Sequence, residues 1–137
     1  MLSNSYERII EWGDCDPANI VFNPNFFAFF DQGTTLLYGA AGFPKKEMVK
    51  IFDAVGAPVV MTSATFHAPC TFGDKVTIVT AILELGSSSF SIQHQLYKGE
   101  VLCVEGVEKR VWTIRDKGSG AIRSAPLPQR LREAFEA

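Results

Sequence analysis

The segment from residue 24 to residue 41 limits what this chain can fold into more than any other segment. Asn23 is a favourable N-cap residue, and Pro24 suits the first helical position. Gly42 and Pro44 follow the segment as signals for the end of a helix. Its apolar side chains occupy most of the helical circumference: Phe26, Phe27, Phe29, Phe30, Leu36, Leu37 and Tyr38. Such a helix is too short to span a membrane, and we predict that it is buried on several sides.

The rest of the chain has the pattern of strands that could cover this helix. We predict a first strand over residues 5–12 and a weaker second helix over residues 44–53. The sequence then becomes rich in Val, Ile, Thr and Phe, with short turns that contain glycine. This pattern predicts four strands joined by three consecutive antiparallel connections, at residues 58–69, 74–85, 89–98 and 101–115. A short terminal helix is expected over residues 128–135.

One long apolar helix and five mostly antiparallel strands indicate an α+β fold in which the sheet curls around the helix. A chain of 137 residues is long enough for one hydrophobic core and short for two. We therefore predict a single domain over residues 1–137, without a linker or an internal repeat.

Charge and composition argue against several classes of function. The formal net charge is −2, and the basic residues form no stripe, so nucleic-acid binding is not expected. No apolar run is long enough to span a bilayer, and residues 1–5 lack the basic start of a secretion signal. We expect a cytoplasmic protein that has no membrane partner.

The cysteines and histidines do not indicate a metal site. The three cysteines, Cys15, Cys70 and Cys103, have no metal-type spacing and are interpreted as reduced thiols. Neither His67 nor His94 has a companion at the spacing of a second ligand. Cys15 also lacks a histidine in its own motif, which argues against a thiol nucleophile.

Asp16 is the strongest candidate for chemistry. It lies in a turn between the first predicted strand and the start of the helix at Asn23. A helix N-terminus offers unpaired N–H donors and a partial positive charge. A carboxylate beside such donors is a minimal apparatus for splitting an activated acyl group. The alternative is a turn-capping aspartate before Pro17, although Asp14 could serve the turn instead. The residues alone leave both interpretations open.

The segment around Asp16 resembles the active-site segment of the hot-dog-fold acyl-CoA thioesterases, in the 4-hydroxybenzoyl-CoA thioesterase branch. The matching residues are Trp12-Gly13-Asp14-Cys15-Asp16-Pro17-Ala18, Ile20-Val21, Pro24-Asn25, Asp31, Val55-Gly56-Ala57-Pro58-Val59-Val60 and Ala64-Thr65-Phe66. The resemblance implies a hot-dog fold and hydrolysis of an aromatic acyl-CoA, with 4-hydroxybenzoyl-CoA as first choice. No cofactor is implied, because CoA is part of the substrate.

The resemblance also implies roles for individual residues. Asp16 would act as nucleophile or general base, and the N–H of Asn23 would polarise the thioester carbonyl. The family usually carries Tyr at the position of Asn23, and a related short-chain branch carries His. Asp31, in an otherwise apolar stretch that makes an unpaired acid costly, would receive the substrate's phenolic hydroxyl from a neighbouring subunit. Its companion contact would be Ala57, where Thr is usual.

A serine-rich turn replaces the basic run with which the resembling enzymes hold the CoA phosphates. Ser88 and Ser89, after Ser87, can hydrogen-bond a phosphate but supply no charge. Basic residues elsewhere could substitute, and the candidates are Lys75, Lys98 and Arg115.

Two further expectations concern assembly and alternative functions. Hot-dog domains expose sheet edges, so a homodimer or a homotetramer built as a dimer of dimers is implied. The alternative substrates are benzoyl-CoA, dihydroxynaphthoyl-CoA or a short aliphatic acyl-CoA. A non-catalytic acyl-CoA-binding hot-dog protein is the alternative from a different class of function.

Overall fold

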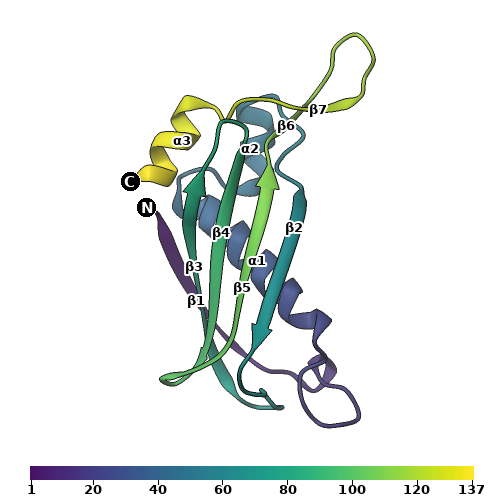
Figure 1. Ribbon diagram of the computed structural model, residues 1–137, viewed down its shortest axis with the longest axis vertical. Helices are drawn as coiled ribbons and strands as arrows, with labels where there is room; N and C mark the ends of the chain where they lie inside the picture. Colours follow the sequence, from purple (N-terminus) through teal and green to yellow (C-terminus); the bar gives the residue numbers. More distant parts are fainter.

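A curved five-stranded antiparallel sheet packs against the long helix α1 (Pro24–Ala40) in the computed structural model, which covers residues 1–137 (Figure 1). The strand order across the sheet is β1-β3-β4-β5-β2. In that order the strands are β1 (Ser3–Ile9), β3 (Lys75–Leu85), β4 (Ser89–Lys98), β5 (Val101–Val111) and β2 (Val59–Phe66). The predicted α+β architecture, with five strands curled around one long helix, is confirmed.

The smaller elements gather mainly at the end of the sheet where α1 terminates (Figure 1). They are the helices α2 (Lys45–Ile51) and α3 (Gln129–Glu136) and the hairpin of β6 (Thr113–Arg115) and β7 (Ile122–Ser124). A short 3-10 turn, η1 (Trp12–Asp14), follows β1 at the opposite end. Both predicted secondary helices are therefore present, each within one or two residues of its predicted bounds. None of the helices is long and apolar enough to cross a membrane.

The strand predicted over residues 101–115 is divided in two. β5 ends at Val111, and β6 pairs with β7 in a separate two-stranded sheet. Between them Trp112 is buried, and its backbone N–H donates to the carbonyl of Ser88 at 2.7 Å. The chain leaves the main sheet at this residue, because its backbone bonds to the β3–β4 turn instead of continuing the ladder.

The position of β2 corrects the predicted connectivity. The hairpins β3–β4 and β4–β5 are present as predicted, but β2 does not pair with β3. It crosses to the far edge of the sheet and pairs with β5, from Val59 opposite Arg110 to Phe66 opposite Val104. The crossing segment is anchored to the sheet, since the side chain of Cys70 is buried and the backbone N–H groups of His67 and Ala68 both donate to the Cys103 carbonyl.

Helix α1 is buried on one side only within this chain. The residues that face the sheet are Phe26, Phe29, Phe30, Gly33, Thr34, Leu37 and Tyr38. The opposite face is small or polar and exposed, with Ala28, Asp31, Gln32 and Gly39. The prediction of burial on several sides was therefore wrong for the isolated chain. The C-terminus agrees with the prediction: Gly42 has φ +90°, and the N–H of Phe43 donates to the Tyr38 carbonyl at 2.9 Å.

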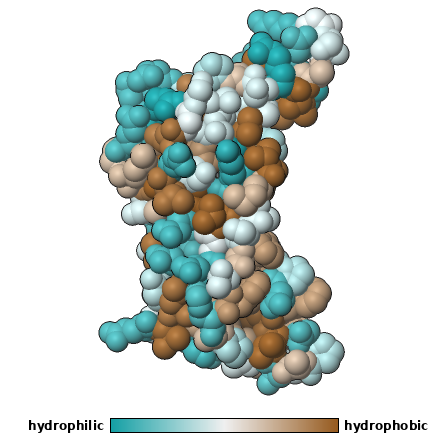
Figure 2. Space-filling model, viewed as in Figure 1, coloured by the Kyte–Doolittle hydropathy of each residue, from teal (hydrophilic) through white to brown (hydrophobic).

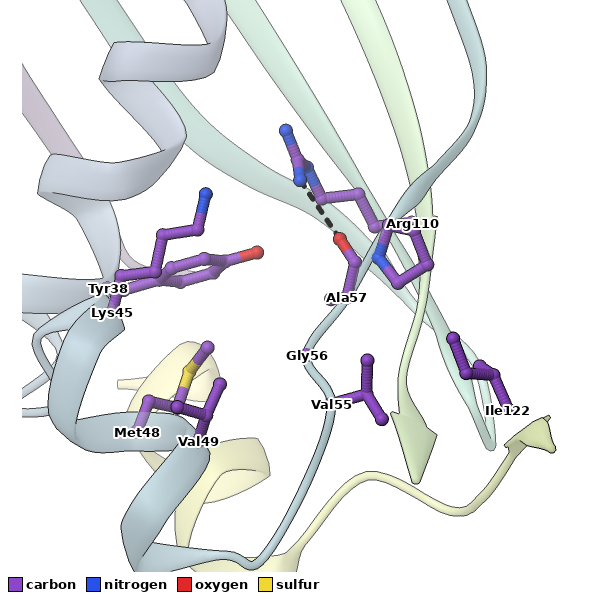
Figure 3. A pocket seen from close by; sticks show the side chains of 10 residues that line it. Tyr38, Lys45, Met48, Val49, Val55, Gly56, Ala57, Arg110 and Ile122 are labelled. Carbon is purple, nitrogen blue, oxygen red and sulfur yellow. Dashed lines mark hydrogen bonds between the residues drawn. The ribbon is translucent and has the colours of Figure 1, made fainter. Parts of the chain in front are cut away.

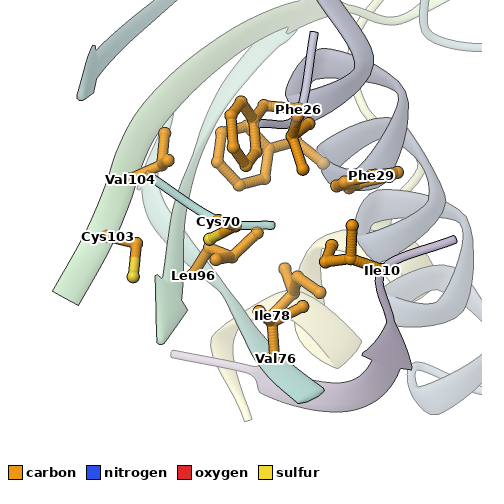
Figure 4. Packing of buried hydrophobic residues seen from close by; sticks show 11 residues of the cluster. Ile10, Phe26, Phe29, Cys70, Val76, Ile78, Leu96, Cys103 and Val104 are labelled. Carbon is orange, nitrogen blue, oxygen red and sulfur yellow. The ribbon is translucent and has the colours of Figure 1, made fainter. Parts of the chain in front are cut away.

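Two hydrophobic clusters fill the space between α1 and the sheet. One surrounds the first turns of α1 (Figure 4), and its largest members include Ile10, Phe26, Phe29 and Phe30. The other surrounds the end of α1 and contains Tyr38, Phe90, Trp112 and Phe135 among others. Apolar residues also reach the surface in patches among hydrophilic ones (Figure 2). On the edge strand β2 these are Val59, Val60, Met61 and Phe66.

Replacing Gly33 with alanine should destabilise the fold. The added methyl would overlap the buried Thr80 hydroxyl, which is hydrogen-bonded to His94. Overpacking of this kind lowers the free energy of unfolding by about 1–3 kcal/mol. The matched control is Gly39→Ala on the exposed face, where the added methyl meets nothing within 4 Å. That variant should gain about 0.5–1 kcal/mol from helix propensity. Urea denaturation followed by circular dichroism measures both, and equal stability of the two variants would contradict the prediction.

Candidate active site

Asp14 holds the loop that carries Asp16. Its carboxylate accepts two hydrogen bonds from Nη2 of Arg8, both at 2.8 Å, and one from the Glu11 N–H at 2.8 Å. Its backbone carbonyl accepts a hydrogen bond from Nδ2 of Asn25, in the first turn of α1, at 2.8 Å. Asp14 therefore serves the turn, as the sequence suggested, and ties the loop to the helix.

Asp16 lies half-buried in the turn that follows. Its Oδ1 accepts the N–H of Ala18 at 2.8 Å, and its backbone carbonyl accepts the N–H of Asn19 at 2.9 Å. Asn19 has φ +63°, a left-handed conformation that suits the tight turn. The turn-capping contact predicted as the alternative is thus present. It occupies one carboxylate oxygen and leaves Oδ2 without a hydrogen bond inside the chain.

The backbone N–H of Asn23 has no hydrogen-bond partner within the chain. Its neighbour Phe22 donates to the Asp14 carbonyl at 2.9 Å, and the following residue is Pro24, which has no N–H. The side chain of Asn23 makes no capping hydrogen bond, and its backbone is helical at φ −47° and ψ −43°. The prediction of an N-cap side chain was therefore wrong, because an N-cap acceptor requires an extended backbone. The free donor at the helix start is present.

Asn23 lies at the edge of a cavity of about 220 Å³, which is mostly apolar. The other residues that line it are Ile20, Val21, Phe26, Phe66, His67, Ala68 and Pro69. Asp16 does not line this cavity, but its loop runs directly into Ile20 and Val21, and the Asp16 N–H donates to the Ile20 carbonyl at 3.0 Å. The structure therefore brings Asp16 and Asn23 to the same end of α1 without direct contact between them.

Asp31 and Ala57 meet at Arg110, a residue that the sequence analysis did not single out. Nη2 of Arg110 donates to Oδ1 of Asp31 at 2.8 Å, and Nη1 donates to the Ala57 carbonyl at 2.9 Å. Asp31 is thus paired rather than surrounded by apolar groups, and its side chain is 55% exposed. Asp31 follows Asn23 by eight residues, which is about 12 Å along a helix. Within one chain the two pairs of candidate residues are therefore separate.

A buried polar network holds Arg110 in place. Glu108 accepts hydrogen bonds from Nε of Arg110 at 2.9 Å and from the Thr34 hydroxyl at 2.8 Å. It also accepts one from Nε2 of His94, whose Nδ1 lies 2.9 Å from the Thr80 hydroxyl. Burial opposes ionisation of Glu108, but the hydrogen bond from His94 and the charge of Arg110 lower its pKa below the ordinary value. The sequence signal for this network was a pair of charged residues, Glu108 and Arg110, at alternate positions of β5 that both face inward.

The serine-rich turn lies between β3 and β4. Its backbone is engaged: the carbonyl of Ser87 accepts the Leu127 N–H at 2.9 Å, and that of Ser88 accepts the Trp112 N–H. Two basic residues lie beside this turn. Nη2 of Arg132 in α3 donates to the Ser87 carbonyl at 3.2 Å, and Lys109 of β5 lines a small hollow together with Gly86 and Ser89. Sequence reasoning missed Arg132, because α3 is remote from the turn along the chain.

The three basic residues suggested as substitutes are engaged elsewhere. Lys75 pairs with Glu7 at 3.1 Å and Lys98 with Asp74 at 3.3 Å, both at the opposite end of the sheet from the β3–β4 turn (Figure 1). Arg115 donates to the Gly120 carbonyl at 2.7 Å, within the β6–β7 hairpin.

Known proteins match this chain over nearly its whole length. The family model described as the thioesterase-like superfamily matches residues 10–135. The 4-hydroxybenzoyl-CoA thioesterase of Pseudomonas sp. strain CBS-3 is 32% identical over 120 residues, covering 83% of this chain and 85% of that protein. Its crystal structure superposes with a TM-score of 0.87 at 30% identity and covers 98% of this chain and 99% of its own.

Two further relatives carry other names. The structure of a gentisyl-coenzyme A thioesterase matches with a TM-score of 0.84 at 33% identity, covering 98% of this chain and all of that one (100%). The 1,4-dihydroxy-2-naphthoyl-CoA hydrolase of Microcystis aeruginosa is 23% identical over 127 residues, covering 93% of this chain and 88% of the hydrolase. These structural matches confirm the predicted hot-dog fold. On the family model and the 32% identical relative, the chain belongs to the 4-hydroxybenzoyl-CoA thioesterase family of the thioesterase-like superfamily and is a thioester hydrolase.

Proposed function

We propose that this thioesterase hydrolyses an aromatic acyl-CoA, with 4-hydroxybenzoyl-CoA as first choice, to the free acid and CoA. The observation that carries the proposal is the unpaired N–H of Asn23 at the start of α1, beside the loop that presents Asp16. The positive end of a helix adds to the effect of this donor. The relatives named above supply the substrate class, because each carries the name of an enzyme for an aromatic acyl-CoA.

In the proposed reaction the thioester carbonyl accepts the N–H of Asn23, which makes its carbon more electrophilic. An oxygen of Asp16 attacks that carbon and forms a mixed anhydride as CoA leaves as thiolate. Water then opens the anhydride, restores the carboxylate and supplies the proton for the thiolate. In the general-base variant, Asp16 removes a proton from the water that attacks the carbonyl. Neither route needs a cofactor, since a thioester is already activated.

The acyl ring would extend from this cavity toward Asp31 and Ala57 of a second chain. β2 is an edge strand with exposed apolar residues, which favours pairing with another copy. If the β2 strands of two chains paired about a two-fold axis, the α1 helices of the two chains would be antiparallel. The Asn23 end of one helix would then approach Asp31 of the other. We propose a homodimer, or a homotetramer of two such dimers, with sites at the interface.

Ser88 and Ser89 are proposed contacts of the CoA phosphates. Both are half-buried in the β3–β4 turn, and neither carries charge. Arg132 lies beside this turn and is proposed to supply positive charge there. Hydroxyl groups without charge bind phosphate more weakly than a basic run does.

A different acyl group is the second candidate. Ala57 has no side-chain hydroxyl to contact the substrate, and its backbone carbonyl is already bonded to Arg110. That difference leaves room for benzoyl-CoA, dihydroxynaphthoyl-CoA or an aliphatic acyl-CoA, and the relatives named for gentisyl-CoA and dihydroxynaphthoyl-CoA favour a substituted ring. A non-catalytic acyl-CoA-binding protein would retain binding without thiol release.

Asp16→Asn should abolish most thiol release while acyl-CoA binding persists. The amide oxygen of asparagine can still accept the Ala18 N–H, so the turn is retained and only the negative charge is lost. We expect kcat to fall by about 10²–10⁴-fold, measured with a thiol reagent. Binding is measured by calorimetry on the same variant. A fall of only a few fold would show that Asp16 merely caps the turn.

Asp31→Asn should discriminate between substrates. A phenolic hydroxyl that donates to the Asp31 carboxylate forms a charge-assisted hydrogen bond, which asparagine forms more weakly. We expect kcat/KM to fall by about 10-fold or more for 4-hydroxybenzoyl-CoA and by much less for benzoyl-CoA. The substitution also weakens the contact between Arg110 and residue 31. This loss affects both substrates equally, so it cancels in the ratio of their kcat/KM values. An unchanged ratio, or faster turnover of aliphatic thioesters than of aryl ones in the wild type, would contradict the proposed specificity.

Ser88→Arg should improve the use of CoA thioesters if the β3–β4 turn contacts the CoA phosphates. A new guanidinium near a phosphate adds a charge-assisted hydrogen bond, and we expect KM to fall by about 3–10-fold at low salt. The improvement should shrink as salt is added, and it should be absent for a truncated thioester without phosphates. Ser5→Arg on β1 is the control, since it adds the same charge at a distance. Equal effects of the two substitutions would place the phosphates elsewhere.

A further inference from the structure

A second cavity lies near the C-terminal end of α1, and it adjoins Ala57, one of the residues proposed to contact the acyl group. It has a volume of about 280 Å³ and lies between α1, α2, residues 55–58 and the inner side of β5 (Figure 3). We call it the Tyr38 cavity. Much of its wall is apolar and comes from Met48, Val49, Val55 and Ile122. Tyr38 lies fifteen residues after Asn23, about 22 Å along a helix, so this cavity is remote from the Asn23 donor of the same chain.

Three polar side chains converge on one side of the Tyr38 cavity. Figure 3 shows the hydroxyl of Tyr38 and the ammonium group of Lys45 pointing toward the side that Arg110 occupies. Lys45 lies at an exposed position and forms no salt bridge. Arg110 uses four of its five N–H donors on Glu108, Asp31 and Ala57, which leaves one N–H on Nη1.

The hydroxyl of Tyr38 is the most informative of these groups. The residue is 1% exposed, yet its hydroxyl has no hydrogen-bond partner in the chain. Burial raises the pKa of Tyr38 above its ordinary value, so the group remains a neutral donor at physiological pH. An unpartnered buried hydroxyl is costly, and native structures rarely keep one unless a ligand or water completes it.

The polar groups of the Tyr38 cavity favour a ligand that accepts hydrogen bonds. Tyr38, Lys45 and Arg110 all offer donors. The lining carbonyls of Gly56, Ala57 and Pro58 already accept hydrogen bonds from other residues of the chain. Glu108 and Asp31 both pair with Arg110, so the free positive charge of the cavity is that of Lys45, which forms no salt bridge. A ligand with a negatively charged, planar head and an apolar body satisfies the donors and fills the apolar walls.

We propose that the Tyr38 cavity binds a small aromatic carboxylate, whose carboxylate group accepts hydrogen bonds from Tyr38, Lys45 and the remaining N–H of Arg110. Because Arg110 also holds Asp31 and Ala57, occupancy of the cavity is coupled to the residues proposed to select the acyl group. An aromatic carboxylate is also what the proposed reaction releases, and only this identification of the ligand as a product rests on the proposed function. Binding of the carboxylate itself does not.

Methionine methyl signals locate the ligand. The chain contains three methionines, and Met48 lines the Tyr38 cavity whereas Met61 lies on β2 and does not. Titration of ¹³C-methyl-methionine-labelled protein with benzoate and with 4-hydroxybenzoate should shift the Met48 signal and leave that of Met61 in place. Benzamide should bind at least 10-fold more weakly than benzoate, because it lacks the charge.

Tyr38→Phe is the decisive variant, since it removes only an oxygen that has no partner and should fold as well as the wild type. It should weaken benzoate binding by about 5–10-fold. Lys45→Met should weaken it by a similar factor and reduce its salt dependence, whereas Lys46→Met, one residue along α2 and outside the cavity, should not. Absence of a Met48 shift, or equal benzoate affinity in the wild type and Tyr38→Phe, would overturn the proposal. Either result leaves the Asp16→Asn measurement untouched, so the two proposals fail separately.

Discussion

The buried ion pair between Glu108 and Arg110 is the interaction on which the rest of this structure depends. Removing two charges from water costs several kcal/mol per ion, and attraction offsets this only where the remaining donors and acceptors are also satisfied. Here all but one are satisfied. Glu108 also binds Thr34 of α1 and His94 of β4, while Arg110 also binds Asp31 and the carbonyl of Ala57 before β2, which leaves one N–H on Nη1. One pair of side chains therefore fixes the helix, two central strands and the start of the edge strand relative to one another.

The same network limits which residues can occupy the neighbouring positions. A carboxylate only accepts hydrogen bonds, so Nε2 of His94 must carry the proton that faces Glu108. The other ring nitrogen of His94, Nδ1, lies 2.9 Å from the Thr80 hydroxyl, and the ring stacks on Phe30 with an interplanar angle of 4°. This stack brings α1 so close to β3 and β4 that only a glycine fits at residue 33. A histidine that looked unremarkable in the sequence is thus a structural member of the core.

Local signals in the sequence were sufficient to predict the helices and strands. They were not sufficient to predict which strands pair or which distant side chains meet. Pro24 and Gly42 marked the ends of α1, and Asp14 was expected to serve its turn. Periodicity along a strand tells which residues face inward, but not which strand lies alongside, so β2 was placed beside β3 instead of β5. Arg110 was missed for the same reason, because its partners Asp31 and Ala57 lie 79 and 53 residues away in sequence. The free N–H of Asn23 was foreseen because a helix start leaves donors unpaired whatever the side chain.

The start and the middle of α1 are held by different kinds of contact, and this difference has a functional consequence. The loop of Asp16 depends on short-range bonds, such as those of Asp14 with Arg8 and with Asn25, and lies half-exposed at the helix start. Asp31 and Ala57 depend on the buried pair, whose disruption leaves an uncompensated charge in the core. The proposed chemistry can therefore be altered at Asp16 with little effect on folding. Changes in the proposed acyl-selecting residues instead act on a group that also stabilises the fold, so specificity and stability are linked at Arg110.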